Sequence, residues 1–263
     1  GSEMCIRDRD TAFVGVGGSF RNLGRISRLI KKYPFNMTHN YELPVTEFEN
    51  IYNTIKKLDL NSTMKIKGLS SGRADIFPSA LAVMKAVLSR FDFQKITISG
   101  CGLREGAMFR YAVPGVNERP LSDVLGHSIY TQMKYHDLNI AHAEHVYNLS
   151  IQLFKQLKVL HKMPRVYVRV LKIAALLHDS GMRIKFYNHQ LHSAYIILNS
   201  NLYGVPHKDI VVAAFVAAGH RKAENARDEI LKYKDMLTQE DVDAIRKLSV
   251  ILRIAESFDR SQS

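Results

Sequence analysis

The feature that most constrains the fold is a change of pattern at about residues 112–120, AVPGVNERP, a stretch rich in breakers and polar residues. Before it, short apolar or β-branched runs that predict strands alternate with helical patterns, and after it only helical periodicity remains. A chain of 263 residues also exceeds the usual size of one domain. The sequence therefore predicts an α/β domain over residues 11–118 and an all-helical domain over residues 119–263. Residues 1–10, GSEMCIRDRD, resemble a tag or assembly scar.

Two strands are expected in the first domain, in TAFVGV and in QKITIS. Helical patterns lie between them, so the strands should form a parallel pair. Two strands alone make a poor sheet. We therefore expect this domain to be part of a larger fold.

Composition narrows the class of protein and its partners. The chain has 37 basic and 25 acidic residues, and a net charge of +12 attracts polyanions such as nucleotides or polyphosphate. It has only two cysteines and no metal-type CxxC, which fits a reducing cytoplasm. The longest apolar run, residues 210–218, is too short to span a bilayer, and no signal peptide is recognisable. The sequence predicts a cytoplasmic protein that binds neither membranes nor specific nucleic acid.

A glycine turn after the first predicted strand is a candidate anion site. Gly17, Gly18 and Ser19 stand where a helix begins, and backbone amides there can approach phosphate with help from the helix dipole. Tight turns use the same glycines, so this pattern alone leaves a structural role open. A dinucleotide fingerprint is excluded because Phe20 stands where the third glycine belongs.

Basic residues strengthen this hypothesis. Along the helix that follows the turn, they recur on one face at i, i+4, i+7 and i+11, as Arg21, Arg25, Arg28 and Lys32. Such a stripe is either a solvated face or a polyphosphate contact. Farther along, Arg73 in SSGRADIFP either orients phosphate or pairs with Asp75.

The second domain contains histidines and carboxylates at helix ends. The sequence AALLHDSG ends an apolar helical run with His178 and Asp179, and neighbours on a helix share one metal most easily at its last turn. Gly181 is expected to supply the helix end. Each residue alone reads as a helix cap or a satisfied core histidine, but imidazoles with carboxylates also suit Mn, Fe, Zn, Ni or Co.

The ordered set H…HD…H…H…D resembles the metal-dependent phosphohydrolase superfamily named for its His-Asp pair. The resemblance implies a divalent-metal site, with the outer histidine, the pair and the last aspartate as ligands and the middle histidines adding a second metal or touching phosphate. In this chain, the residues that the resemblance assigns to the site are His142, His178, Asp179, His192, His220 and Asp259.

Three further stretches, FVGVGGSFRNLGRI, GLSSGRADIFPSALAVMKAVL and ITISGCGLREG, precede this domain in that order. Together with HSAYIILNS they resemble the exopolyphosphatase / guanosine pentaphosphate phosphohydrolase family. The resemblance implies that residues 11–118 are the end of the second lobe of an actin-like, ribonuclease H-like ATPase core, followed by a helical His-Asp domain. By that comparison the first lobe, with its phosphate loop and catalytic glutamate, is absent.

Three hypotheses follow from the sequence. The first is Mg- or Mn-assisted hydrolysis of polyphosphate or guanosine pentaphosphate by a homodimeric family member, in which Gly17, Gly18, Ser19, Arg21, Arg25 and Arg73 bind substrate. The catalytic base would lie outside this chain, so the chain alone is expected to lack full activity. The second places metal-dependent phosphate-ester hydrolysis in the helical domain. The third is a non-catalytic polyanion-binding and dimerisation module.

Overall fold

The computed structural model describes residues 12–112, 121–221 and 227–259. The chain divides into two compact units, Gly1–Pro120 (unit 1) and Leu121–Ser263 (unit 2). The proposed scar, residues 1–10, and most of the expected linker, residues 113–120, lie outside the described residues. The described part is mostly helical with one small sheet, as the sequence predicted.

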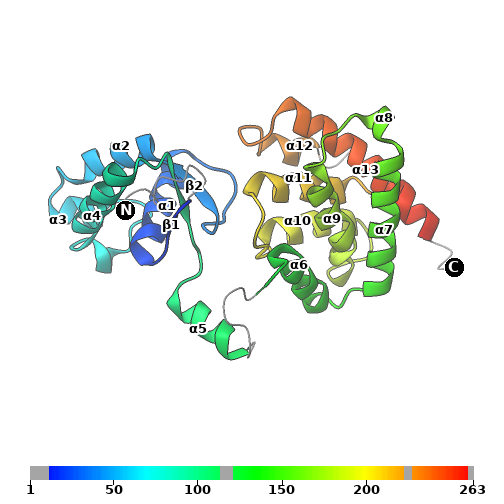
Figure 1. Cartoon of the computed structure of the whole chain (residues 1–263), viewed down its shortest axis with the longest axis horizontal. Helices are drawn as coiled ribbons and strands as arrows, with labels where there is room; N and C mark the ends of the chain where they lie inside the picture. Colours follow the sequence, from blue (N-terminus) through cyan, green and yellow to red (C-terminus); the bar gives the residue numbers. More distant parts are fainter. Residues whose placement is uncertain (1–11, 113–120, 222–226, 260–263) are drawn as a thin grey trace, which may run out of the picture. The chain divides into compact units, whose positions relative to one another are not determined.

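Unit 1 contains a three-stranded sheet in the order β1-β3-β2 (Figure 1), made of β1 (Phe13–Gly15), β2 (Tyr41–Pro44) and β3 (Lys95–Ile98). β1 is parallel to β3, which confirms the expected pair. β2, which was not predicted, is antiparallel to the other edge of β3. It is only four residues long and ends in Pro44, a residue tolerated at sheet edges.

Unit 1 also contains α1 (Gly18–Ile30), α2 (Val45–Ile55), α3 (Leu60–Met64), α4 (Phe77–Phe91) and α5 (Leu103–Ala112), with a short 3-10 turn, η2 (Ser71–Arg73). The sheet encloses a hydrophobic core with α1, α2 and α4, whereas α5 contributes no buried residue. Leu23 and Ile26 of α1 are buried, whereas Ile30, in the last turn of this helix, is exposed. The core therefore holds the start of α1, and the glycine turn before it, against the sheet.

Unit 2 consists of helices in its described residues. They are α6 (Val124–Tyr135), α7 (Ile140–Gln156), α8 (Lys158–His161), α9 (Tyr167–Leu177), α10 (His189–Asn199), α11 (His207–Ala218), α12 (Arg227–Leu231) and α13 (Gln239–Asp259), with a 3-10 turn, η3 (Ser180–Arg183). Their helical structure agrees with the helical periodicity that the sequence shows after residue 120. α9 packs against α6, α7, α11 and α13, which makes it the central helix of this unit.

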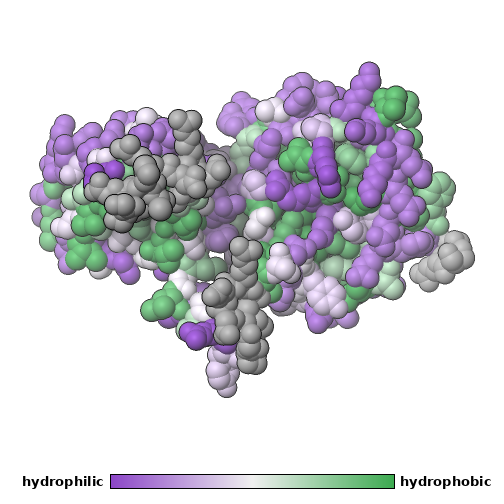
Figure 2. Space-filling view, in the orientation of Figure 1, coloured by the Kyte–Doolittle hydropathy of each residue, from purple (hydrophilic) through white to green (hydrophobic). Residues whose placement is uncertain are grey.

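The surface of both units is mixed. On the face drawn in Figure 2, hydrophilic side chains predominate and hydrophobic ones appear between them. Within the described ranges, no helix combines the length and the apolar character needed to cross a lipid bilayer.

Candidate metal centre and anion site

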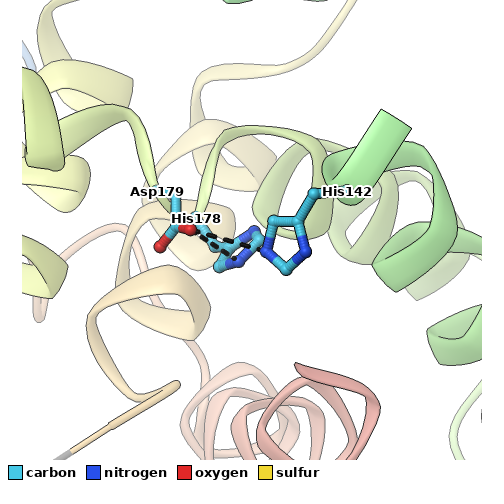
Figure 3. A group of neighbouring side chains, drawn as sticks. All are labelled: His142, His178 and Asp179. Carbon is cyan, nitrogen blue, oxygen red and sulfur yellow. Dashed lines mark ion pairs between the residues drawn. The ribbon is translucent and has the colours of Figure 1, made fainter. Parts of the chain in front are cut away.

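Two groups of side chains in unit 2 bring imidazole and carboxylate donors close enough to share a cation. The first group is His142, His178 and Asp179, and the second is Asp179, His189 and His220. Within each group, one donor atom from every residue lies within 4.8 Å of the others. Figure 3 shows the first group, in which His142 comes from α7 and the pair from the end of α9. Asp179 belongs to both groups and joins them.

The end of α9 explains how two adjacent residues serve one site. His178 still has helical backbone angles, but Asp179 leaves the helix with φ −98° and ψ 4°. The approximately 100° divergence of successive helical side chains therefore does not apply to the pair. Asp179 Oδ2 lies 3.5 Å from His178 Nε2 and 3.5 Å from His142 Nε2.

Gly181 has a different role from the expected helix cap. It lies inside η3 and does not have a positive φ. A Cβ at this position would lie 2.1 Å from the carbonyl oxygen of His189 and 2.5 Å from the nitrogen of Ser193. The glycine thus lets η3 touch α10, and this contact brings His189 beside Asp179.

Three histidines share one hydrogen-bond pattern that fixes their tautomer. His178, His189 and His220 each direct Nδ1 at the carbonyl oxygen three residues earlier, at 2.7, 2.9 and 2.6 Å respectively. A carbonyl oxygen only accepts, so each Nδ1 carries the hydrogen and donates it. Each neutral ring therefore presents the lone pair of Nε2 to the site, which is the arrangement of metal-ligating histidines.

The donors are poorly paired with one another, which fits a missing cation. His178 Nε2 and Asp179 Oδ1 are buried and have no hydrogen-bond partner. His189 Nε2 lies 3.1 Å from His220 Nε2 and 3.1 Å from Asp179 Oδ1. Two lone pairs at that distance repel unless a proton or a metal ion lies between them. The residues present therefore fit a borderline divalent cation bound by nitrogen and oxygen.

The histidines of the site differ in the direction in which their pKa is shifted. Burial, together with nearby His178, lowers the pKa of His220 to about 3, so this ring is neutral. The hydrogen bond with Asp179 raises the pKa of His142 to about 9 against the effect of burial, and Asp259 adds to the rise. Burial opposes ionisation of Asp179, but the nearby rings of His142 and His189 lower its pKa overall. The site thus contains one histidine whose charged form is favoured, His142, and one whose charged form is disfavoured, His220.

Asp259 was expected to bind metal, but the structure places it in neither group. Its two carboxylate oxygens accept hydrogen bonds from Nδ1 of His142 and Nδ1 of His145. The contact with His142 turns the Nε2 atom of that ring toward Asp179, so Asp259 orients a donor. Sequence reasoning did not assign His145 to the site, although its spacing from His142, one helical turn, was available as a signal.

His192 also lies outside both groups, and His189 takes the expected place. Both belong to α10, but His189 is fully buried whereas His192 is partly exposed. The buried face of α10 includes Ser193 and Ile197, and His189 is in phase with these residues. The helical phase could therefore have distinguished the two histidines.

In unit 1, several of the residues predicted to bind anions lie around the start of α1. Gly17 precedes α1 with φ 109°, and α1 has no side-chain cap and no acidic residue in its first turn. A Cβ on Gly18 would lie 2.4 Å from Cζ of Arg73, so the guanidinium packs directly against this glycine. Ser19 follows in the first turn, and Arg21 donates a 3.3 Å hydrogen bond to the carbonyl oxygen of Gly100.

The predicted basic stripe is not uniform. Arg25 is exposed, but Arg28 is half-buried and donates to the carbonyl oxygen of Phe35, to Asn36 Oδ1 and to Thr38 Oγ1. Arg28 therefore holds the loop after α1. Among the described contacts, Arg73 forms no ion pair with Asp75, the partner that the sequence left open.

Comparison with known proteins covers both units. Residues 126–263 match the model of the Ppx/GppA phosphatase, domain III, and residues 10–113 match that of the Ppx/GppA phosphatase family. A guanosine-5'-triphosphate,3'-diphosphate pyrophosphatase of Aeromonas hydrophila is 32% identical over 73% of this chain and 37% of its own length. Its namesake from Aeromonas salmonicida is 32% identical over 54% of this chain and 28% of its own length. The chain thus spans about a third of the length of these relatives. One domain model alone matches more than half of the chain, and on this ground the chain belongs to the Ppx/GppA phosphatase family.

Proposed function

We propose that this chain takes part in hydrolysis of the phosphoanhydride of guanosine pentaphosphate, the substrate class named for its relatives, with inorganic polyphosphate as the alternative. The observation that carries the proposal is the start of α1, where no side chain caps the helix and the guanidinium of Arg73 packs against Gly18. Amides and a cation at a helix start stabilise negative charge on phosphate oxygens. The two units would correspond to part of an actin-like lobe and to a His-Asp domain.

In this reaction the residues of unit 1 would bind and orient the phosphate chain. Arg73 and Arg21 would hold the leaving phosphate, and Arg25 would attract the polyanion from solution. Mg or Mn would supply charge neutralisation when bound with substrate. Among the described residues we assign no catalytic base. Light scattering of the purified chain would test the homodimer that the family resemblance implies.

The test measures binding and phosphate release separately. The chain is incubated with Mg²⁺ and either guanosine pentaphosphate or polyphosphate of defined length, and Arg73→Glu is compared with Lys67→Glu, an exchange on an exposed loop lysine. Binding that Arg73→Glu weakens and Lys67→Glu preserves supports the site. Phosphate release shows that the chain is active alone, whereas binding without release assigns it the binding role. Failure to bind either compound contradicts the proposal.

A second candidate function is favoured by the contact between His189 and His220. It is metal-dependent hydrolysis of a phosphate ester by unit 2, with His142, His178, Asp179, His189 and His220 holding the metal. The bound cation would act as a Lewis acid toward phosphate. Asp259 would keep His142 in position through its Nδ1 atom.

This second function is tested by metal content before any assay. Elemental analysis and thermal melting of purified protein, with and without chelator, are compared for the parent and Asp179→Ala. Stoichiometric metal that is lost in Asp179→Ala, with a lower melting temperature after chelation, supports the centre. Identical melting temperatures and no metal in all samples would contradict this function. His178 and Asp179 would then be only polar residues at the end of a helix.

A further inference from the structure

A cavity of about 450 Å³ opens beside the first metal group. It lies between the connection from α6 to α7, the start of α7, the end of α9 and η3, and both His142 and Asp179 line it. His189 and His220 are fully buried and do not line it. A ligand would therefore reach the donor atoms from the side of His142. The volume lies within the range of small-molecule pockets, roughly 300–1,000 Å³.

The wall of this cavity is partly apolar. The side chains responsible come from three elements and the connection before α7, and they are Leu138, Ala143, Leu176 and Met182. Such a surface favours contact with an uncharged organic group, because burying apolar area stabilises a complex by roughly 25 cal/mol per Å².

Apart from the metal group, the lining of the cavity carries little positive charge. Arg183 is the only lysine or arginine among the described residues that line it, and its Nη1 atom lies 3.7 Å from Oδ2 of Asp137. Burial, with Arg183 nearby, lowers the pKa of His136 and so disfavours the charged form of this ring. A polyphosphate chain carries a negative charge on every phosphate and needs a series of cations to bind. The lining offers one arginine, which already faces an aspartate.

We infer that this cavity binds a small phosphate monoester whose organic part is uncharged. Its phosphate would meet the metal held by His142, His178 and Asp179, and its organic part would lie against Leu138, Leu176 and Met182. The inference rests on the second candidate function, the metal centre of unit 2, and it assigns that centre a ligand class different from the polyanion expected at the start of α1. Met182 is the specificity-determining residue, because it is partly exposed and stands at the wall of the cavity.

The experiment uses the full chain loaded with Mn²⁺, and calorimetry measures binding without any reaction. The probes are phenylphosphonate, methylphosphonate and tripolyphosphate. Two variants enlarge neighbouring side chains, namely Met182→Trp at the cavity wall and Ile184→Trp, which is also partly exposed but does not line the cavity. Elemental analysis and circular dichroism confirm that each variant keeps its metal and its helices.

We expect phenylphosphonate to bind more tightly than methylphosphonate because of the apolar wall. Met182→Trp should weaken phenylphosphonate binding about tenfold, equivalent to about 1.4 kcal/mol, and Ile184→Trp should leave it within about twofold. Tripolyphosphate, bound elsewhere, should not respond to either variant. The inference is overturned if Met182→Trp leaves phenylphosphonate binding unchanged, or if it weakens tripolyphosphate more than phenylphosphonate. If the parent protein binds no metal, the metal centre itself is contradicted. Elemental analysis distinguishes this result from a failure of the ligand proposal.

Discussion

The Nε2 atoms of His189 and His220 lie 3.1 Å apart, and both rings donate from Nδ1 to backbone carbonyls. Fixed in this way, the two rings present lone pairs to each other and to Asp179. The backbone of the loop before α10 and that of α11 thus prepare the donors before any ligand arrives. Such preorganisation lowers the cost of binding a metal, because the rings need not be ordered at that moment.

Replacing each of two histidines of α10 in turn should show which one binds metal. His189→Ala removes a nitrogen that faces Asp179, so we expect metal affinity to fall roughly 10–100-fold or more. His192→Ala, the matched control on the same helix, should retain affinity because His192 lies outside both donor groups. Metal titration by calorimetry measures both. Equal losses in the two variants would refute the assignment of His189.

Arginines of α1 should divide into binding and structural residues. Arg25→Glu should weaken polyphosphate binding and make it less dependent on salt, because Arg25 is exposed and its interaction with polyanions is screened. Arg28→Glu should mainly destabilise the protein, by about 1–3 kcal/mol, because three hydrogen bonds to the loop after α1 are lost. Binding titrations over a range of salt and denaturant unfolding distinguish these effects. Full stability of Arg28→Glu would contradict the structural role.

A methyl group at position 181 should disturb the contact between η3 and α10. Gly181→Ala places a Cβ 2.1 Å from the carbonyl oxygen of His189, and overpacking of this kind costs about 1–3 kcal/mol. We expect lower stability and weaker metal binding together, since the same contact places His189. The control is Gly106→Ala in α5, where a Cβ meets nothing within 4 Å and alanine favours the helix. Denaturant unfolding should show no loss for Gly106→Ala.

Acid should weaken unit 2 partly through Asp241. Burial opposes ionisation of this carboxylate, but hydrogen bonds from Thr238, Lys208 and Tyr167 lower its pKa overall. A lowered pKa in the folded state means that the unfolded chain binds more protons. The stabilisation is therefore present above the unfolded value of about 4 and is lost as the pH falls through the folded value.

The matching measurement compares the parent with Asp241→Asn by denaturant unfolding from pH 7 to pH 3. The parent should be the more stable at neutral pH, and the difference should shrink below about pH 4. Asp243, a half-exposed carboxylate two residues farther along α13, provides the control as Asp243→Asn. A difference between parent and Asp241→Asn that stays constant with pH would show that charge is not the cause.

The sequence predicted the main helices and the parallel strands because long apolar periodicities and β-branched runs are local signals. β2 escaped prediction because four residues ending in Pro44 carry little propensity, although the buried Tyr41 and Leu43 alternate with exposed residues. The helical phase of α10 could have favoured His189 over His192, because His189 lies on the same buried face as Ser193 and Ile197. Arg28 looked like its exposed neighbours because the loop that follows α1 folds back to accept its hydrogen bonds, which the sequence pattern does not show.

The central position of α9 links the metal donors to the stability of unit 2. His178 is the residue that directly follows this helix, and most side chains of α9 are buried among α6, α7, α11 and α13. Amide hydrogens in such a helix exchange with solvent mainly when the whole unit unfolds. The geometry of the metal donors would then persist for as long as the domain stays folded. The rate of deuterium uptake along α9 would therefore report how often the site is lost through unfolding.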